Sequence, residues 1–170
     1  MKSYLGGGPI FVAGGSSGVG LEVVKQLSAI GTPVRALVRR PEAKAALEKL
    51  NGVTAFLGDA KDPQAVQSAM ENCVAAVTTL GGKKEGEERI DYVGNSNVIE
   101  QAGILGCERV ILVTSIGCGD SKEAVSPQVR EQFVNYNSNR TLIFPPSPLF
   151  FPFFSFFFFV LFFFPYVSYT

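Results

Sequence analysis

The sequence predicts an α/β fold in which a parallel β-sheet is covered by helices on both faces. Two observations support this prediction. Short apolar stretches alternate with helix-forming stretches over roughly the first 133 residues, as in a series of β-α-β units. The apolar stretches are nearly continuous, which is typical of strands buried on both faces. Strands joined in this way run parallel, with right-handed crossovers.

The first strand is predicted at residues 10–13 (IFVA), and it leads directly into a glycine-rich turn. The turn opens a helix, and Gly31 is placed to cap the end of that helix. The apolar residues of this helix recur every three residues and are Leu21, Val24, Leu27 and Ile30.

Four further strands are predicted at 34–38, 53–57, 73–79 and 109–114. The helices between them are predicted at 41–50, 63–70 and 87–105. Pro41 and Pro63 stand at first helical positions, where proline is favoured, and Asp62 is expected to cap its helix. The inward residues of the last helix are expected to be Ile90, either Val93 or Val98, and Ala102.

The turn that follows the first strand, GGSSGVG at 14–20, indicates a dinucleotide ligand. The N-terminus of a helix offers unpaired N–H groups and partial positive charge, which suit a pyrophosphate. In this pattern Gly14 permits a sharp turn, Gly18 lets the backbone approach phosphate, and Gly20 lets the helix pack closely on the strand. Ser16 and Ser17 add hydroxyl donors. The alternative is an ordinary tight turn with no ligand.

The composition excludes several other functions. The chain has 15 basic and 15 acidic residues, and this zero net charge argues against a nucleic-acid partner. It has no histidine, which excludes histidine general bases, Ser–His pairs and His-based zinc sites. Its three cysteines lack CxxC spacing and are expected to be buried thiols, in the cytoplasm or an organelle interior. The short, polar N-terminus does not resemble a signal peptide.

Residues 9–133 resemble the atypical short-chain dehydrogenase/reductases, in particular the NmrA-like group that includes flavin and biliverdin-IXβ reductases. The segments that carry the resemblance are VAGGSSGVG (12–20), VRALVRRPEA (34–43), FLGDAKDP (56–63), DYVGNSNVIEQAG (91–103) and RVILVTSIG (109–117). The resemblance implies a Rossmann-type doubly wound sheet with strand order 3-2-1-4-5 and the cofactor over the carboxyl ends of the strands. A full domain of this type would continue beyond the fifth strand, so we expect the C-terminal part of the fold to be missing.

Two arginines at the end of the second strand indicate which dinucleotide binds. An acidic residue there would bind the ribose 2′-hydroxyl of NAD, whereas Arg39 and Arg40 suit the 2′-phosphate of NADP. We therefore expect NADP in preference to NAD, with Arg39 ahead of Arg40. Two solvated arginines with no ligand are the alternative.

The resemblance implies the remaining site residues. Asp59 corresponds to a residue that contacts the adenine amino group, and its alternative is a turn or cap role. Ser115 matches the family's active-site serine, and a serine that merely caps a turn is its alternative. The full set expected to bind the dinucleotide is Gly14, Ser16, Ser17, Gly18, Val19, Gly20, Arg39, Arg40, Asp59, Thr79, Leu80, Gly81 and Thr114.

The resemblance leaves the activity open. Reductases of the larger family use Tyr-x-x-x-Lys, in which lysine lowers the tyrosine pKa, whereas this chain has only Tyr136 and Arg140 at that spacing. Arginine is a poor proton relay because it stays charged. The leading hypothesis is hydride transfer from NADPH to a small carbonyl or flavin-like acceptor. The alternative is a non-catalytic NADP sensor or scaffold of the same fold.

The composition changes abruptly after about residue 134. Twelve of the 15 phenylalanines lie between Phe144 and Phe164, four prolines interrupt this stretch, and a fifth proline follows it directly. We expect this tail, 134–170, to be non-native or disordered. A pyrimidine-rich stretch of DNA encodes such a run, and a retained intron or a frame error beginning near Phe133 would produce it. A membrane-associated segment and a folded part of the domain are the alternatives. A membrane-anchored NADP-binding protein depends on the tail being genuine.

Overall fold

The computed structural model describes residues 7–81 and 90–113, and these form a parallel sheet with helices between the strands. The strands are β1 (Ile10–Ala13), β2 (Val34–Val38), β3 (Val53–Leu57), β4 (Ala75–Thr78) and β5 (Arg109–Leu112). Their order in the sheet is β3-β2-β1-β4-β5, and all neighbours run parallel. The predicted fold class and strand order are therefore confirmed.

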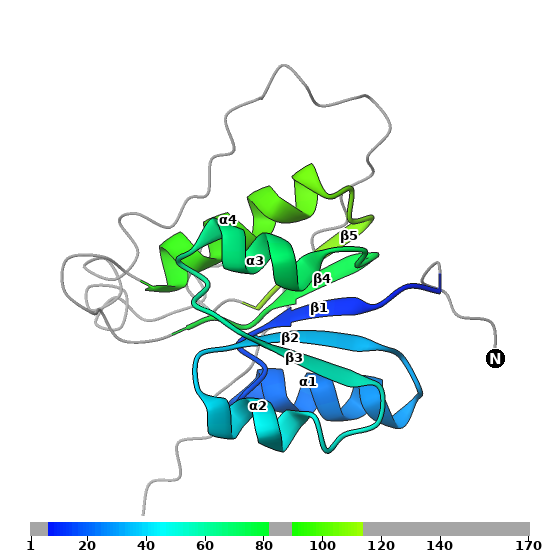
Figure 1. Cartoon of the computed structure of the whole chain (residues 1–170). Coiled ribbons are helices and arrows are strands. Elements are labelled where there is room, and N and C mark those ends of the chain that lie inside the picture. The colour runs from blue at the N-terminus through cyan, green and yellow to red at the C-terminus, as the bar shows by residue number, and fades with distance from the viewer. Residues whose placement is uncertain (1–6, 82–89, 114–170) are drawn as a thin grey trace, which may run out of the picture. The chain divides into compact units, whose positions relative to one another are not determined.

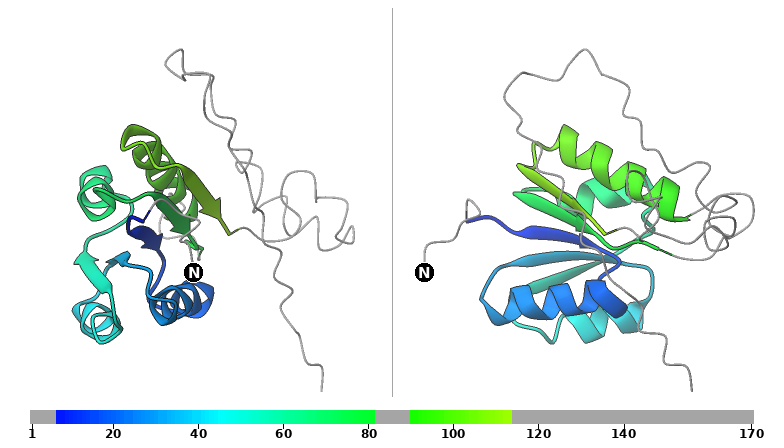
Figure 2. Two further views of the ribbon diagram at one scale, coloured as in Figure 1. Left: turned by 90° about the vertical axis from the view of Figure 1, so that its right-hand side faces the viewer. Right: turned by 180° about the vertical axis from the view of Figure 1, so that it is seen from behind.

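In the described part of the chain, four helices cover the sheet in pairs. They are α1 (Gly18–Ala29), α2 (Pro41–Leu47), α3 (Pro63–Met70) and α4 (Ile90–Ile104). Figure 1 and the end-on view in Figure 2 show α1 and α2 on one face, with α3 and α4 on the other. This doubly wound arrangement leaves the ends of the strands as the edges where loops converge.

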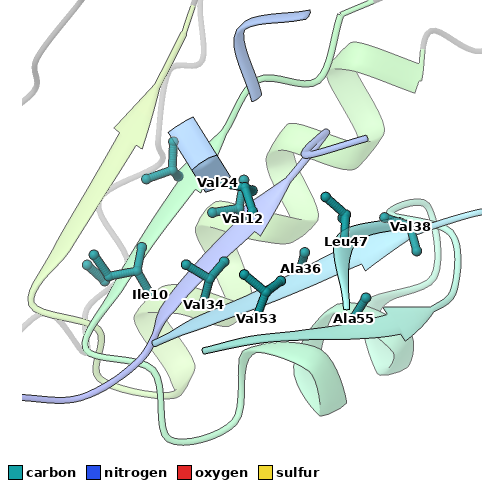
Figure 3. Close-up of a cluster of buried hydrophobic side chains, with 11 residues drawn as sticks. Ile10, Val12, Val24, Val34, Ala36, Val38, Leu47, Val53 and Ala55 are labelled. Carbon is teal, nitrogen blue, oxygen red and sulfur yellow. The ribbon is translucent and has the colours of Figure 1, made fainter. Parts of the chain in front are cut away.

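The core on the α1–α2 side is built from every second residue of the strands, because successive side chains of a strand point to opposite faces. Figure 3 shows this cluster, in which Val24 of α1 and Leu47 of α2 pack on valine, alanine and isoleucine side chains of the sheet. Its buried members are Ile10, Val12, Val24, Val34, Ala36, Val38, Leu47, Val53, Ala55, Ala75 and Val77. On the opposite face, Phe11, Thr78 and Val98 are completely buried.

Some element boundaries differ from the prediction. Helix α2 ends at Leu47 and not at residue 50, because the chain turns there and the Leu50 N–H bonds the Leu47 carbonyl. Strand β4 begins at Ala75 and not at residue 73, because the Cys73 N–H closes the turn after α3. Ile30 is the C-cap residue of α1 and is 75% exposed.

Other expectations about the helices are confirmed. The Asp62 side chain accepts a hydrogen bond from the Gln64 N–H and caps α3, and Pro63 is the first helical residue. Gly31 follows α1 with φ +75°, a conformation that favours glycine. In α4, Val98 and Ala102 face inward and are fully buried.

Several predicted features lie outside the described residues. They are Thr114, Ser115, Cys118, the pair Tyr136 and Arg140, and the tail 134–170. Among the helices in the described ranges, none is long and apolar enough to cross a membrane.

Candidate functional site

The glycine-rich turn lies at the carboxyl end of β1 and is packed tightly against the end of β4. Gly14 has φ +81°, and a Cβ there would lie 2.6 Å from the Thr79 Oγ1. A Cβ on Gly20 would lie 2.3 Å from the Gly14 carbonyl oxygen. The Thr79 hydroxyl lies 3.2 Å from the Ala13 carbonyl and 3.3 Å from that of Gly14, so it can donate to either. The predicted close approach at Gly20 is thus a contact between α1, the turn and β4.

The first turn of α1 has the features that a pyrophosphate requires. Its leading N–H groups have no partner within the helix, and no acidic residue lies in this turn. Ser17 is the N-cap residue, yet its hydroxyl makes no capping hydrogen bond. Gly18 has φ +53°, and a Cβ there would meet none of the described residues within 4 Å. The turn therefore presents donors beside open space, which fits a dinucleotide phosphate.

A pocket of about 390 Å³ connects this turn to the end of β2. It is lined by Ser16 and Ser17 from the turn, and by Arg39, Arg40 and Ala43 from the β2–α2 connection. The structure thus brings together two sets of predicted site residues that are about 20 positions apart in the sequence. Two hydroxyl groups and two guanidinium groups around one hollow form an anion-binding environment.

Asp59 occupies the loop between β3 and α3, where its side chain supports a turn. Its Oδ1 accepts a hydrogen bond from the Lys61 N–H at 3.0 Å, and its carbonyl accepts one from the Asp62 N–H. The structure therefore shows the turn role of Asp59. Its predicted contact with adenine stays a prediction.

The residues after β4 lie beside the glycine turn, because β4 is the neighbour of β1. Thr79 and Leu80 are half-buried, whereas Gly81 is exposed and a Cβ there would meet nothing within 4 Å. Crowding by the described residues therefore does not explain why this position is a glycine. The last two predicted site residues, Thr114 and the catalytic candidate Ser115, follow β5 and lie outside the described residues.

A family model described as NAD(P)H-binding matches residues 14–141 of this chain. The match begins at the glycine turn and includes the arginines, the β3–α3 loop and the end of β4. The chain belongs to this NAD(P)H-binding family. A nicotinamide dinucleotide is therefore the cofactor class of this domain, and the resemblance to the atypical, NmrA-like reductases is confirmed.

Individual relatives include reductases and epimerases. The chain is similar to the structure of ChuY, an anaerobilin reductase from Escherichia coli O157:H7, with 33% identity, a TM-score of 0.65, and coverage of 75% of this chain and 60% of that one. It is 30% identical over 112 residues to sterol demethylase protein B of Methylococcus capsulatus, covering 62% of this chain and 34% of the relative. It is 31% identical over 87 residues to the uncharacterized sugar epimerase YhfK of Bacillus subtilis, covering 49% of this chain and 41% of the relative. The chain thus spans about a third of the first relative's length and 60% of ChuY's.

The structure also shows the direction of Arg35, which strand alternation leaves open. Its Nε and Nη2 donate to the Ala69 and Ser68 carbonyls at 2.8 and 2.9 Å, and its guanidinium lies 4.3 Å from the Phe56 ring centroid. These carbonyls belong to the last turn of α3, where a cation is favoured. Arg35 is therefore a structural residue on the α3 face, and it does not line the pocket at the end of β2.

Two buried amides of α4 are not among the residues predicted from the sequence. They are Asn95 and Asn97, which are 8% and 9% exposed. Asn95 bonds to residues at the end of β4, and Asn97 bonds to the Ala60 carbonyl in the β3–α3 loop. One signal could have indicated Asn95, which lies three and seven residues before the inward Val98 and Ala102. A polar residue on an apolar helical face needs a buried partner.

Two cysteines lie at the opposite edge of the sheet, before β4 and β5. Cys73 and Cys107 are buried free thiols, as predicted, and the Cys107 thiol bonds the Cys73 carbonyl at 3.4 Å. Burial raises the pKa of the Cys73 thiol to about 12, although the Arg35 charge acts in the opposite direction and Cys107 adds to the increase. Burial also raises the pKa of Cys107. Neither thiol is a reactive thiolate at neutral pH, and the described residues hold no cluster of metal-ligating side chains.

Proposed function

We propose that this domain binds NADP(H) in preference to NAD(H), with the 2′-phosphate in the pocket formed by Ser16, Ser17, Arg39 and Arg40. The observation that carries the proposal is the convergence of these side chains on one hollow at the end of β2. In this fold the second strand ends beside the adenosine ribose of the bound dinucleotide. The 2′ position of that ribose, where NADP carries a phosphate and NAD a hydroxyl, would then lie in this hollow. Among the described residues, no acidic side chain lines this hollow to bind the 2′-hydroxyl of NAD.

Binding can be measured by titrating the protein with NADPH and NADH and following cofactor fluorescence. We expect tighter binding of NADPH, and a loss of about ten-fold in NADPH affinity for Arg39→Ala or Arg40→Ala, because each removes one charge-assisted contact to phosphate. Affinity for NADH is expected to stay nearly unchanged in both variants.

The matched control is Lys49→Ala, which removes one exposed positive charge outside the pocket. If Lys49→Ala weakens NADPH binding as much as Arg39→Ala, the effect is only general electrostatics. Equal affinity of the unmodified protein for NADPH and NADH would contradict the 2′-phosphate assignment.

The proposed activity is reduction of a small carbonyl or flavin-like acceptor, and the similarity to an anaerobilin reductase supports it. Bound NADPH would supply the hydride. Ser115 is our candidate catalytic residue, which would hydrogen-bond the acceptor carbonyl or position the nicotinamide.

The activity test measures NADPH consumption with a panel of flavins, quinones and anaerobilin. We expect turnover with at least one acceptor, and a lower kcat for Ser115→Ala with unchanged NADPH affinity. NADPH binding without consumption of any acceptor would favour the non-catalytic sensor or scaffold.

A further inference from the structure

A closed ring of three hydrogen bonds lies at the carboxyl end of β4. The Thr78 hydroxyl donates to the Asn95 Oδ1 at 2.5 Å, and the Asn95 Nδ2 donates to the Leu80 carbonyl at 3.2 Å. The Leu80 N–H in turn lies 3.4 Å from the Thr78 hydroxyl oxygen. Thr78 is fully buried and Asn95 is 8% exposed, so water does not replace these bonds easily. The ring fixes the backbone from Thr78 to Leu80 relative to α4.

The same stretch of α4 also holds the loop after β3. The Asn97 Nδ2 donates to the Ala60 carbonyl at 2.8 Å, next to Asp59. Gly94 lies between the two loops, since a Cβ there would be 2.9 Å from the Leu80 Cδ1 and 3.2 Å from the Ala60 Cβ. One turn of α4 therefore fixes both loops, although it does not line the arginine pocket itself.

The positions of these loops relate to the two halves of a dinucleotide. Strand β1 lies between β2 and β4, so a pyrophosphate over the β1 turn has one nucleoside toward β2 and the other toward β4. With the 2′-phosphate at the end of β2, the adenosine half lies on the β2–β3 side. The nicotinamide half then lies over the end of β4.

We infer that Asn95 is a positioning residue for the nicotinamide half of the cofactor, acting through the Thr78–Leu80 backbone, and that Asn97 acts in the same way for the adenosine half. The inference rests on the proposed function. Thr79, in the backbone after β4, also contacts the glycine turn. A change in the direction of this backbone would therefore alter the surface on which the nicotinamide half lies.

The test compares Thr78→Val with Thr78→Ser, because valine has nearly the same shape without the hydroxyl and serine keeps the hydroxyl. Calorimetric titration uses two ligands: NADP⁺, and adenosine 2′,5′-bisphosphate as the adenosine half alone. Thr78→Val is expected to weaken NADP⁺ binding about ten-fold but to leave the bisphosphate within about two-fold, since the ring acts only on the β4 side. Thr78→Ser is expected to bind both ligands within about two-fold of the unmodified protein.

Asn97→Leu supplies the opposite case. It removes the bond to the Ala60 carbonyl, so it is expected to weaken NADP⁺ and the bisphosphate by the same factor. Thermal unfolding of each variant records any loss of stability separately from binding.

The binding of the two ligands distinguishes a failure of the positioning role from a failure of the proposed function. If Thr78→Val weakens both ligands equally, or binds NADP⁺ as Thr78→Ser does, the positioning role of the Asn95 ring is wrong. If the unmodified protein binds neither ligand, the proposed function itself fails and the inference fails with it.

Discussion

The two edges of the parallel sheet differ in what they contain. At the carboxyl ends of the strands lie the glycine turn, the arginine pocket and the half-buried residues Thr79 and Leu80, beside open space at Gly18. At the amino ends, before β4 and β5, lie two buried free thiols. The amino-terminal half of β2 carries Arg35, whose guanidinium is bound to α3 carbonyls. The carboxyl edge has helix N–H groups without partners inside α1, whereas the Arg35 guanidinium and the Cys107 thiol near the amino edge donate to carbonyl groups of the protein.

This difference follows from the direction of parallel strands. Every strand ends at the same edge, and the helix that follows begins there with unpaired N–H groups. We therefore expect substitutions at the carboxyl edge to alter cofactor binding and substitutions near the amino edge to alter stability alone.

Gly20→Ala is expected to have the largest effect and to reduce both the stability of the protein and its cofactor binding. Its Cβ would lie 2.3 Å from the Gly14 carbonyl oxygen and 2.4 Å from the Thr79 Oγ1, so backbone must move. We expect a loss of about 3 kcal/mol in the free energy of unfolding, at the upper end of the overpacking range, and loss of dinucleotide binding. Urea unfolding and NADPH titration measure the two effects.

Gly103→Ala in α4 is the control, since a Cβ there would meet nothing within 4 Å. It is expected to raise stability by about 0.5 kcal/mol, because alanine favours a helix more than glycine does. Wild-type stability of Gly20→Ala would show that the close packing of α1 on the turn is not needed.

Arg35→Met is expected to reduce stability without altering cofactor binding. The variant loses two hydrogen bonds from a charged group and the contact with the Phe56 ring. We expect a loss of about 2 kcal/mol in the free energy of unfolding, measured in urea.

The matched control is Arg40→Met at the other end of the same strand, where the side chain is exposed. Its free energy of unfolding is expected to change by less than about 0.5 kcal/mol, while NADPH affinity falls. If Arg35→Met lowers NADPH affinity without destabilising the protein, the separation between the two edges is wrong.

Stability is expected to fall at alkaline pH because of the buried thiols. The Cys73 thiol has its pKa raised by burial from 9.0 to about 12, so the unfolded chain loses this proton at lower pH than the folded protein. The stabilisation that the protonated Cys73 thiol gives the folded protein is therefore complete below pH 9.0, and it decreases as the pH rises toward about 12. The slope from one such group reaches at most about 1.4 kcal/mol per pH unit.

The measurement compares urea unfolding of the unmodified protein and Cys73→Ala across this pH range. The variant is expected to show a shallower decrease, and NADPH binding at neutral pH is expected to be the same in both proteins. Identical pH slopes would contradict a buried, protonated Cys73.

The sequence predicted the succession of strands and helices, and the family resemblance predicted the order of the strands in the sheet. Neither predicted the hydrogen bonds that support this arrangement. The strands are continuous apolar stretches and the helices begin at Pro41 and Pro63, which are local signals. The partners of Asn95 and Asn97 lie 15 to 37 residues away, so no local pattern identifies them. The alternation of a strand does not predict the direction of the Arg35 side chain, because both faces of β2 are covered by helices. The ends of α2 and β4 depend on turn hydrogen bonds formed only in the folded chain.

A map of backbone amide chemical shifts on adding NADP⁺ and, separately, NAD⁺ tests most directly whether NADP(H) binds at the carboxyl edge of the sheet. We predict that both ligands shift the amides of Gly14–Gly20 and of Thr79–Gly81, and that the amides around Arg39 and Arg40 shift more strongly with NADP⁺. The amides of Cys73 and Cys107 are predicted to stay unchanged. Shifts centred on the amino ends of β4 and β5, or equal shifts around Arg39 and Arg40 with the two ligands, would contradict an NADP(H) site at the carboxyl edge of the sheet.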